Sequence, residues 1–399
     1  MIMNVEYENI IMLLKYVVSN AQEDDDLKKR LHEMSKNVDW NYTHTFFSSH
    51  GVVPLTVQLI QFVPEEFADL INEWKQAAYS NVYASSGLIK KQTHIIELLN
   101  RSGIAVVVLK GTTAARYYPK PVLRSMGDID LLVKPEDFNS AVKCLKSIGC
   151  SKETIQNKSN EERHRSFQYM GVVIELHRYF STSVNRDYSK ILDDLIFGKI
   201  SSDSSMLPDD ENGLVLLAHI AQHLEAGIGL RQIIDWFMFV KVCLDDEMWY
   251  SSFQEKARKT GLEALAITVT KMCQIHLGLT TENITWCKDA DEALCDDLIK
   301  YVMECGNFGR NREILQSTAV ERFPKISHPI RFMKYIQSRG ERNWETIKMH
   351  PYLKPFAWVY QSCRYIKLAF QNKVGTKKLK AIYNEGNKRN EMFAALGLK

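Results

Sequence analysis

The sequence predicts an α+β protein in which a small mixed sheet lies between an N-terminal and a C-terminal helical region. Short apolar runs of β-type composition gather in one stretch of about 100 residues, whereas apolar residues before and after that stretch recur at helical spacing. A length of 399 residues, with 45% hydrophobic and 25% charged residues, is ordinary for a globular protein and allows two or three domains. We expect a helical region over 1–80, an α/β core over 81–200 and a helical region over 201–399.

The N-terminal region is predicted to be helical because its apolar residues follow the i, i+3, i+4, i+7 pattern, as in Ile10, Leu13, Leu14 and Val17. A loop at 50–54 interrupts this pattern. A long amphipathic helix is expected over 65–100, and Ser102-Gly103 is a plausible stop for it.

The central region alternates strand and helix signals. A strand at 105–109 leads to a turn at Gly111 and a helix near 113–118, and Pro119-Lys120-Pro121 ends that helix. A second strand is expected at 128–133, followed by a helix from Pro135 to about 148. Gly171 is the turn of a predicted hairpin between 168–170 and 172–177.

The chain after about Ser201 is predicted to be helical, with interruptions at 306–309 and 324–329. The segment from Ile326 onward contains fifteen Lys or Arg and four acids. Its charge is therefore +11, and the charge of the remaining residues is −8. Interleaved aromatics make two interpretations possible, a packed helical domain or a surface for an anionic partner. We favour the packed domain, because helices that mix aromatic and basic residues are common without nucleic acid.

Two acids at the start of the second strand are the strongest functional signal. Asp128 and Asp130 are separated by one apolar residue, so in a strand their side chains lie on the same face. Adjacent like charges are costly unless a cation lies between them, and Mg²⁺ prefers oxygen ligands of this kind. Glu175 lies in another short β-like run, and the three acids on neighbouring strands would form a site for one or two metal ions.

Residues next to the first strand have the chemistry of a phosphate site. Gly111 provides the turn that lets backbone N–H groups approach phosphate oxygens, although a simple strand-to-helix turn would use the same residue. Lys110 and Arg124 are candidate phosphate contacts, and each is equally compatible with a surface charge. The sequence contains no G-x-x-x-x-G-K-[ST] motif, so a P-loop is not expected.

The order of an apolar strand, Lys110-Gly111-Thr112, a helix, Asp128-Ile129-Asp130 and a later strand with Glu175 resembles the polymerase-β-type nucleotidyltransferase superfamily. The run LKGTTAARYYPKPVLRSMGDIDLLV (109–133) resembles, more closely, a bacterial family of uncharacterised nucleotidyltransferases. Segments 50–55 and 229–235 also fit that family. One departure is Thr112, which stands where the superfamily usually has Ser or Gly.

The resemblance implies a magnesium-dependent (or manganese-dependent) nucleotidyltransferase, with ATP or another nucleoside triphosphate as donor. In the implied mechanism Asp128 and Asp130 hold two Mg²⁺ ions, while Glu175 completes the second ion's shell and helps to remove the acceptor proton. Lys110, Gly111, Thr112 and Arg124 would bind the nucleotide. Attack on the α-phosphate would expel pyrophosphate and leave a nucleoside monophosphate on a hydroxyl acceptor, which is a small molecule, a protein side chain or an RNA end. The alternative is a non-catalytic nucleotide- or anion-binding protein that retains the fold.

Five further residues have weaker signals. His219 and His223 are four apart on one predicted helix, but they lack the Glu of an HExxH motif and a third zinc ligand, so a structural or pocket-lining role is favoured over zinc. Arg231 and Asp235 have the same spacing and can form an ion pair with each other, or line the pocket. His177 shares a strand face with Glu175 and either orients the acceptor or hydrogen-bonds a neighbour.

The remaining features indicate a cytoplasmic protein. The eight cysteines are scattered without a CxxC pair, as expected for reduced thiols. The first residues lack the pattern of a signal peptide, and no window has the length of apolar sequence that a membrane span requires.

Overall fold

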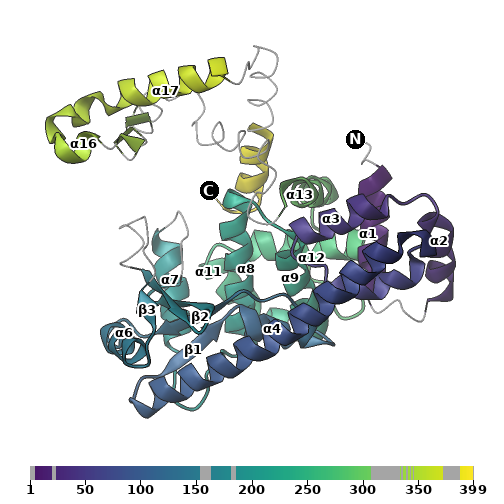
Figure 1. Ribbon diagram of the computed structural model, residues 1–399, viewed down its shortest axis with the longest axis horizontal. Coiled ribbons are helices and arrows are strands. Elements are labelled where there is room, and N and C mark those ends of the chain that lie inside the picture. Colours follow the sequence, from purple (N-terminus) through teal and green to yellow (C-terminus); the bar gives the residue numbers. More distant parts are fainter. Residues whose placement is uncertain are drawn as a thin grey trace. The chain divides into compact units, whose positions relative to one another are not determined.

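The computed structural model describes residues 5–19, 24–152, 163–180, 186–306, 346–371 and 387–398, together with positions 333, 336–337, 340–341 and 343–344. The chain divides into two compact units (Figure 1): unit 1 comprises Met1–Arg310 and Ala395–Lys399, and unit 2 comprises Asn311–Ala394. The last five residues therefore belong to unit 1 although a whole unit precedes them in the sequence.

The predicted α+β class is confirmed. One five-stranded mixed sheet has the order β1-β2-β5-β4-β3, in which only the β2/β5 pair is parallel. Its strands are β1 (Val106–Leu109), β2 (Asp128–Val133), β3 (Ser151–Lys152), β4 (His164–Tyr169) and β5 (Val172–His177). The strands predicted at 105–109 and 128–133 and the hairpin at Gly171 are all present. The two-residue strand β3 was not predicted, and β4 begins earlier than the sequence pattern indicated.

The helices before the sheet follow the predicted helical pattern, whereas α5 lies earlier than the helix expected near 113–118 and α7 was not predicted. The loop at 50–54 separates α3 from a 3₁₀ helix, and the long amphipathic helix is α4. These elements are α1 (Val5–Val18), α2 (Asp25–Ser35), α3 (Trp40–Ser49), the 3₁₀ helices η2 (Leu55–Phe62) and η3 (Glu65–Phe67), α4 (Ala68–Arg101), α5 (Gly111–Ala115), the 3₁₀ turn η4 (Pro121–Leu123), α6 (Phe138–Ser147) and α7 (Arg186–Phe197).

The chain after the sheet is helical through 305, as expected. Its elements in unit 1 are α8 (Asp209–Ala226), α9 (Leu230–Val242), α10 (Asp246–Met248), the π-helical turn η6 (Trp249–Phe253), α11 (Gln254–Lys259), α12 (Glu263–Leu277) and α13 (Glu292–Cys305). Unit 2 contains α16 (Thr346–Met349), η8 (Pro351–Phe356) and α17 (Ala357–Gln371). The predicted interruptions at 307–309 and 324–329 lie outside the described residues.

Aspartate side chains start several of these helices by accepting a hydrogen bond from the first-turn backbone, which leaves fewer N–H groups without a partner. Each of these carboxylates accepts one backbone N–H at 2.8–2.9 Å: Asp24 accepts from Leu27, Asp39 from Tyr42, Asp245 from Met248 and Asp291 from Ala293. Gly213 has a packing role, because a Cβ there would lie 2.5 Å from the ring of Phe239. The glycine therefore allows α8 to approach α9 closely.

The two faces of the sheet differ in chemistry. One face packs on α4 and α6 in an apolar core that includes Ile129, Leu131, Val133, Ile174 and Leu176 (Figure 1). The alternation of side chains along a strand places Asp128, Asp130, Glu175 and His177 on the other face. The fold thus uses one face of β2 and β5 for stability and presents the acids on the opposite face.

Helices from both ends of unit 1 pack together. Helix α1 packs against α12 and α9, and the backbone N–H of Leu230 donates to Nδ1 of the buried His50 at 3.1 Å. The expected regional boundaries at 80 and 200 remain predictions. Within the described residues, no helix is both long and apolar enough to cross a membrane.

Candidate functional site

The acids lie on adjacent parallel strands. In the β2/β5 register Asp130 is paired with Glu175 and Asp128 with Val173, so the three carboxylates occupy one patch of the sheet face. Asp130 is 4% exposed, the Glu175 side chain is 30% exposed, and Asp128 is exposed at the start of β2. The predicted convergence of these three acids is therefore present in the structure.

Two nitrogen atoms lie against the central carboxylate. Lys110 Nζ is 3.1 Å from Asp130 Oδ1, and His177 Nε2 is 3.0 Å from the same oxygen. His177 Nε2 is also 3.5 Å from Glu175 Oε2. His177 therefore bridges the two acids, while Lys110 reaches them from the end of β1, where Leu109 is paired with Asp130.

These contacts set the electrostatics of the site. Burial alone would raise the pKa of Asp130, but the charge of Lys110 and the hydrogen bond from His177 hold that pKa well below its usual range. The hydrogen bond from His177 lowers the pKa of Glu175. Partial burial, together with the negative charge of Asp130, raises the pKa of Asp128 to about 6. Asp128 is thus the acid whose charge is least compensated by the protein.

The turn between β1 and α5 brings its backbone beside the acids. Lys110 has a φ of +51° and Gly111 a φ of +36°, and a Cβ on Gly111 would lie 4.0 Å from the carbonyl oxygen of Asp128. Thr113 fixes this turn, since its N–H and Oγ1 donate to the Lys110 carbonyl at 2.8 and 2.6 Å. The hydroxyl of Thr112 instead hydrogen-bonds the side chain of Gln92 on α4.

A buried ion pair joins α9 to the segment before β2. Arg124 donates from Nε and from a terminal nitrogen to the two oxygens of Asp235, at 2.7 and 2.6 Å, and the Tyr118 hydroxyl donates to the same carboxylate at 2.7 Å. The remaining terminal nitrogen of Arg124 is 3.3 Å from the Ser125 carbonyl. Asp235 therefore pairs with Arg124 and not with Arg231, its neighbour at i−4.

Arg231 lies on the same helix with a different environment. One of its terminal nitrogens donates to the carbonyl of Ser125 at 3.3 Å, and among the described residues no carboxylate forms an ion pair with it. Burial and the adjacent positive charge of Arg124 lower the pKa of Arg231, whereas the charges of Asp235 and Asp128 raise it. Its guanidinium keeps most of its five N–H donors available for an anion.

The histidine pair on α8 is half-buried, and the charge of Lys110 acts on both imidazoles. Nε2 of His219 and Nε2 of His223 are 2.9 Å apart. Burial, reinforced by the charge of Lys110, holds the pKa of His219 well below its ordinary value, and burial lowers the pKa of His223 to about 4. Within the described part of the chain no third metal-ligating side chain joins this pair, which fits neutral histidines that line the site.

Asp130, Glu175 and His177 are able to hold a metal ion, because one ligand atom from each lies within 4.8 Å of the others. A divalent ion with ligands at about 2.1 Å separates opposite ligands by about 4.2 Å, so small adjustments would bring these atoms around one ion. Two carboxylates and an imidazole suit Mg²⁺ and Mn²⁺ through oxygen, and Mn²⁺ also through nitrogen.

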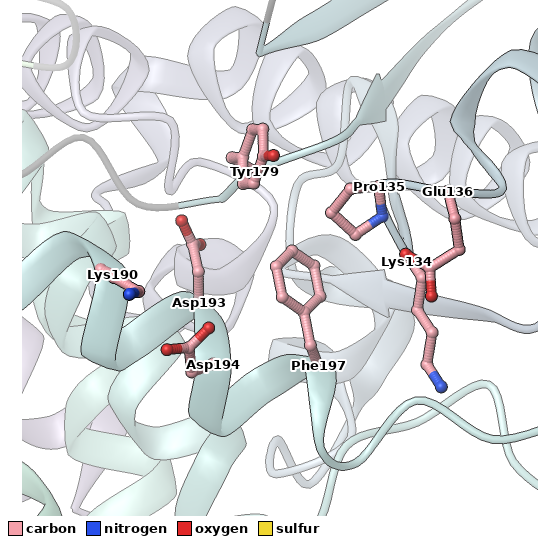
Figure 2. A pocket seen from close by; sticks show the side chains of 8 residues that line it. All are labelled: Lys134, Pro135, Glu136, Tyr179, Lys190, Asp193, Asp194 and Phe197. Atoms are coloured by element: carbon pink, nitrogen blue, oxygen red, sulfur yellow. The ribbon is translucent and has the colours of Figure 1, made fainter.

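A separate pocket of about 700 Å³ lies beyond the other end of β2. Its walls come from Lys134, Pro135 and Glu136 after β2, Tyr179 after β5, and side chains of α7 (Figure 2). Lys134 is four residues beyond Asp130, about 13 Å along an extended chain. The pocket is therefore distinct from the cluster of acids.

Sequence reasoning placed the three acids on neighbouring strands, as the register has them, but it did not identify three contacts. These contacts are the bridge through His177, the pairing of Lys110 with Asp130, and the pairing of Asp235 with Arg124 in place of Arg231. All three depend on strand register or on residues far apart in the sequence. A usable signal existed for Lys110, because it follows an apolar strand that had to lie beside Asp128–Val133.

A comparison with protein families gives one match. The model of a family described as uncharacterised nucleotidyltransferase covers residues 36–278, which is more than half of the chain and includes every residue of the candidate site. No curated protein and no solved structure matches the sequence.

Proposed function

The chain belongs to this family of uncharacterised nucleotidyltransferases, and on that premise we propose that it transfers a nucleoside monophosphate from a nucleoside triphosphate to a hydroxyl acceptor and releases pyrophosphate. The observation that carries the proposal is the pairing of Asp130 with Glu175 across β2 and β5, with Asp128 on the same face. A protein that only bound a nucleotide would gain little from three carboxylates placed where the phosphates must lie.

Asp128, Asp130 and Glu175 are the proposed metal ligands, with Mg²⁺ or Mn²⁺ as the ion. When bound, a divalent ion neutralises charge on the triphosphate and lowers the pKa of an attacking hydroxyl. Lys110 and His177 hold the Asp130 carboxylate in place through Oδ1. This fixed orientation reduces the rearrangement needed when substrate arrives.

The nucleotide is proposed to lie between the β1–α5 turn and α9. The backbone at Lys110, Gly111 and Thr112 adjoins the start of β2 and would approach the phosphates. Arg231 is the guanidinium that we assign to the triphosphate, because all three nitrogen atoms of Arg124 already have partners in Asp235 and Ser125. Arg124 and Asp235 would then position α9 and the segment before β2.

In the proposed reaction the acceptor oxygen attacks the α-phosphorus and forms a new P–O bond. The bond from the α-phosphorus to the bridging oxygen breaks, and pyrophosphate leaves with that electron pair. The acceptor proton passes to Glu175. The contact between His177 Nε2 and Glu175 Oε2 keeps that carboxylate oriented. The acceptor class stays open among small molecules, protein side chains and RNA ends.

The test is a transfer assay with α-labelled nucleoside triphosphates, Mg²⁺ or Mn²⁺, and fractionated cell extract as the acceptor source. We expect pyrophosphate release and a labelled product that depend on one class of fraction. Asp130→Asn should lower the rate by several orders of magnitude, whereas Asp203→Asn, at an exposed loop position, should not. Nucleotide binding without product in any fraction, by a protein that melts normally, would favour the non-catalytic alternative.

A further inference from the structure

We propose that His219 recognises a ribose hydroxyl of the bound nucleotide, through a ring nitrogen, Nδ1, that the protein keeps without a proton. The inference rests on the proposed function and deepens it, because it states which part of the nucleotide this side chain reads. The sequence indicates only a structural or pocket-lining role for this histidine.

Helix α8 presents His219 on the face that it turns toward α5. Asn212, on the same helix, donates from Nδ2 to the carbonyl oxygen of Thr113 at 3.4 Å and to the Tyr117 hydroxyl at 3.0 Å. His219 follows Asn212 by seven residues, or two helical turns, so the two side chains lie on the same face of α8. That face is directed toward α5 and toward the turn at Lys110 that precedes it.

The charges that act on His219 belong largely to the groups assigned to the nucleotide. Burial holds the pKa of His219 well below its ordinary value, the positive charges of Lys110 and Arg231 lower it further, and the charge of Asp130 raises it. Lys110 begins the turn that would approach the phosphates, and Arg231 is the guanidinium assigned to the triphosphate. The imidazole of His219 is therefore neutral at pH 7 and lies on the nucleotide side of the site.

Two hydrogen bonds fix which nitrogen of each imidazole carries the proton. Nδ1 of His223 is 3.4 Å from the carbonyl oxygen of Gly227, and a carbonyl oxygen only accepts, so this nitrogen carries the proton. Burial lowers the pKa of His223 to about 4, so its ring is neutral at pH 7 and its Nε2 has a lone pair. Nε2 of His219 is 2.9 Å from that nitrogen and donates to it. The neutral ring of His219 then has its own lone pair on Nδ1.

Nδ1 of His219 is open to a ligand. It has no hydrogen-bond partner among the described residues, and it is not one of the buried side-chain atoms there that lack a partner. It therefore remains in contact with solvent, where a polar ligand is able to reach it. A nitrogen without a proton accepts a hydrogen bond and cannot donate one, so it does not pair with phosphate oxygens, which are also acceptors.

The ligand group that pairs with this nitrogen must be a donor close to the phosphates. In a nucleoside triphosphate the ribose follows the α-phosphate directly, so its hydroxyls are nearer to the phosphates than any donor group of the base. The acceptor hydroxyl is the other donor at the α-phosphorus, and the proposed reaction places it beside Glu175. A ribose hydroxyl thus fits both the position and the chemistry of His219.

The experiment measures nucleotide binding to the full-length protein by calorimetry in the presence of Mg²⁺. Its ligands are a ribonucleoside triphosphate analogue that cannot be cleaved between the α- and β-phosphates, and the 2′-deoxy and 3′-deoxy forms of that analogue. We expect one deoxy form to bind the wild-type protein about 5- to 50-fold more weakly than the ribo form. In His219→Phe, which keeps a flat ring without an acceptor, the ribo form should bind as weakly as that deoxy form. The matched control is His94→Phe, at an exposed position on α4, which should keep the wild-type ratio.

A second measurement locates the ring proton without nucleotide. In protein labelled with ¹⁵N-histidine, long-range ¹H–¹⁵N spectra distinguish the two neutral tautomers, and the signals lost in the variant identify His219. We expect its proton on Nε2. A proton on Nδ1, equal binding of all three nucleotides by the wild-type protein, or a ratio of Kd values that His219→Phe leaves unchanged would each overturn the inference and leave the proposed function intact. If the wild-type protein binds none of the three nucleotides, the proposed function itself fails. His219→Leu takes the same place in both measurements if His219→Phe does not fold.

Discussion

Individual buried side chains determine how the protein responds to pH, and His50 is the clearest case. It is 1% exposed, and its Nδ1 accepts the backbone N–H of Leu230. Burial lowers its pKa to about 3. The folded state therefore keeps this imidazole neutral at pH values where the unfolded chain protonates it, below about 6.5.

We expect this residue to lower the free energy of unfolding as the pH falls. Between pH 7 and pH 5 the unfolded chain gains a proton at His50 and the folded chain does not, so stability drops by on the order of 2 kcal/mol. Urea unfolding at pH 7 and at pH 5 would measure this change in the free energy of unfolding. His50→Asn, which keeps an acceptor but cannot titrate, should lose that part of the pH dependence; His350→Asn, at an exposed position, should retain it. Equal pH dependence in the wild type and His50→Asn would contradict the prediction.

Arg231 gives a prediction about affinity. Because its guanidinium has one backbone acceptor and no carboxylate partner among the described residues, its removal should weaken triphosphate binding without loss of fold. Charge-assisted hydrogen bonds of this kind contribute about 1.5–3 kcal/mol. We therefore expect Arg231→Gln to raise the Kd for a nucleoside triphosphate analogue that cannot be cleaved between the α- and β-phosphates by about 10- to 100-fold. Calorimetry would show it, with Arg258→Gln on α11 as the control. An unchanged Kd would remove Arg231 from the site.

At the scale of elements, one buried ion pair links α9 to the segment before β2. Arg124 is 5% and Asp235 2% exposed, so Asp235→Ala leaves a buried guanidinium without its anion. We expect a loss of about 3–5 kcal/mol in the free energy of unfolding. The double variant Arg124→Met with Asp235→Leu should recover much of it, because it removes both charges.

The exposed pair of Glu255 and Lys259 provides the comparison for this experiment. Both side chains are more than half exposed, and Glu255→Ala should therefore leave the free energy of unfolding nearly unchanged. A similar small effect from Asp235→Ala would show that α9 is held by its apolar contacts alone.

The elements also show where sequence reasoning succeeds. Strand β2 was predicted with its observed bounds because two acids enter an apolar run there, and both signals are local. Strand β3 has two residues and exists only through pairing with β4, so no local pattern could indicate it. An ion pair between Asp235 and Arg231 was one of two interpretations, because i, i+4 spacing is the only neighbourhood visible in one helix. In the structure Asp235 pairs with Arg124, which is 111 residues away.

The whole molecule raises the question of what the basic C-terminal segment does. In unit 2 the Trp344 ring stacks on Tyr360, with centroids 5.0 Å apart and planes within 3°, as the packed-domain interpretation predicts. Much of the +11 segment lies outside the described residues. We continue to expect only weak, sequence-independent RNA binding at physiological salt. Tight binding that falls steeply with salt would make an RNA acceptor the leading hypothesis.

Removal of the chain from Ile326 onward should destabilise unit 1, and the structure identifies a specific cause. Leu396 is 0% exposed and belongs to unit 1, so the truncation removes part of that unit's core. We expect Leu396→Ala alone to cost about 2–4 kcal/mol, and the half-buried Leu398→Ala less. Thermal melts of both variants and of a 1–325 fragment measure this. A 1–325 fragment that melts like the full-length protein would contradict it.

The return of the last five residues to unit 1 has a thermodynamic consequence. Their docking closes a loop that contains the whole of unit 2, and the entropy lost on closing a loop grows with the length of flexible chain inside it. A folded unit 2 replaces that flexible chain with a body of fixed dimensions and so reduces the entropy lost. Any ligand that stabilises unit 2 should therefore raise the melting temperature of unit 1, even if it never touches the sheet face that carries the acids.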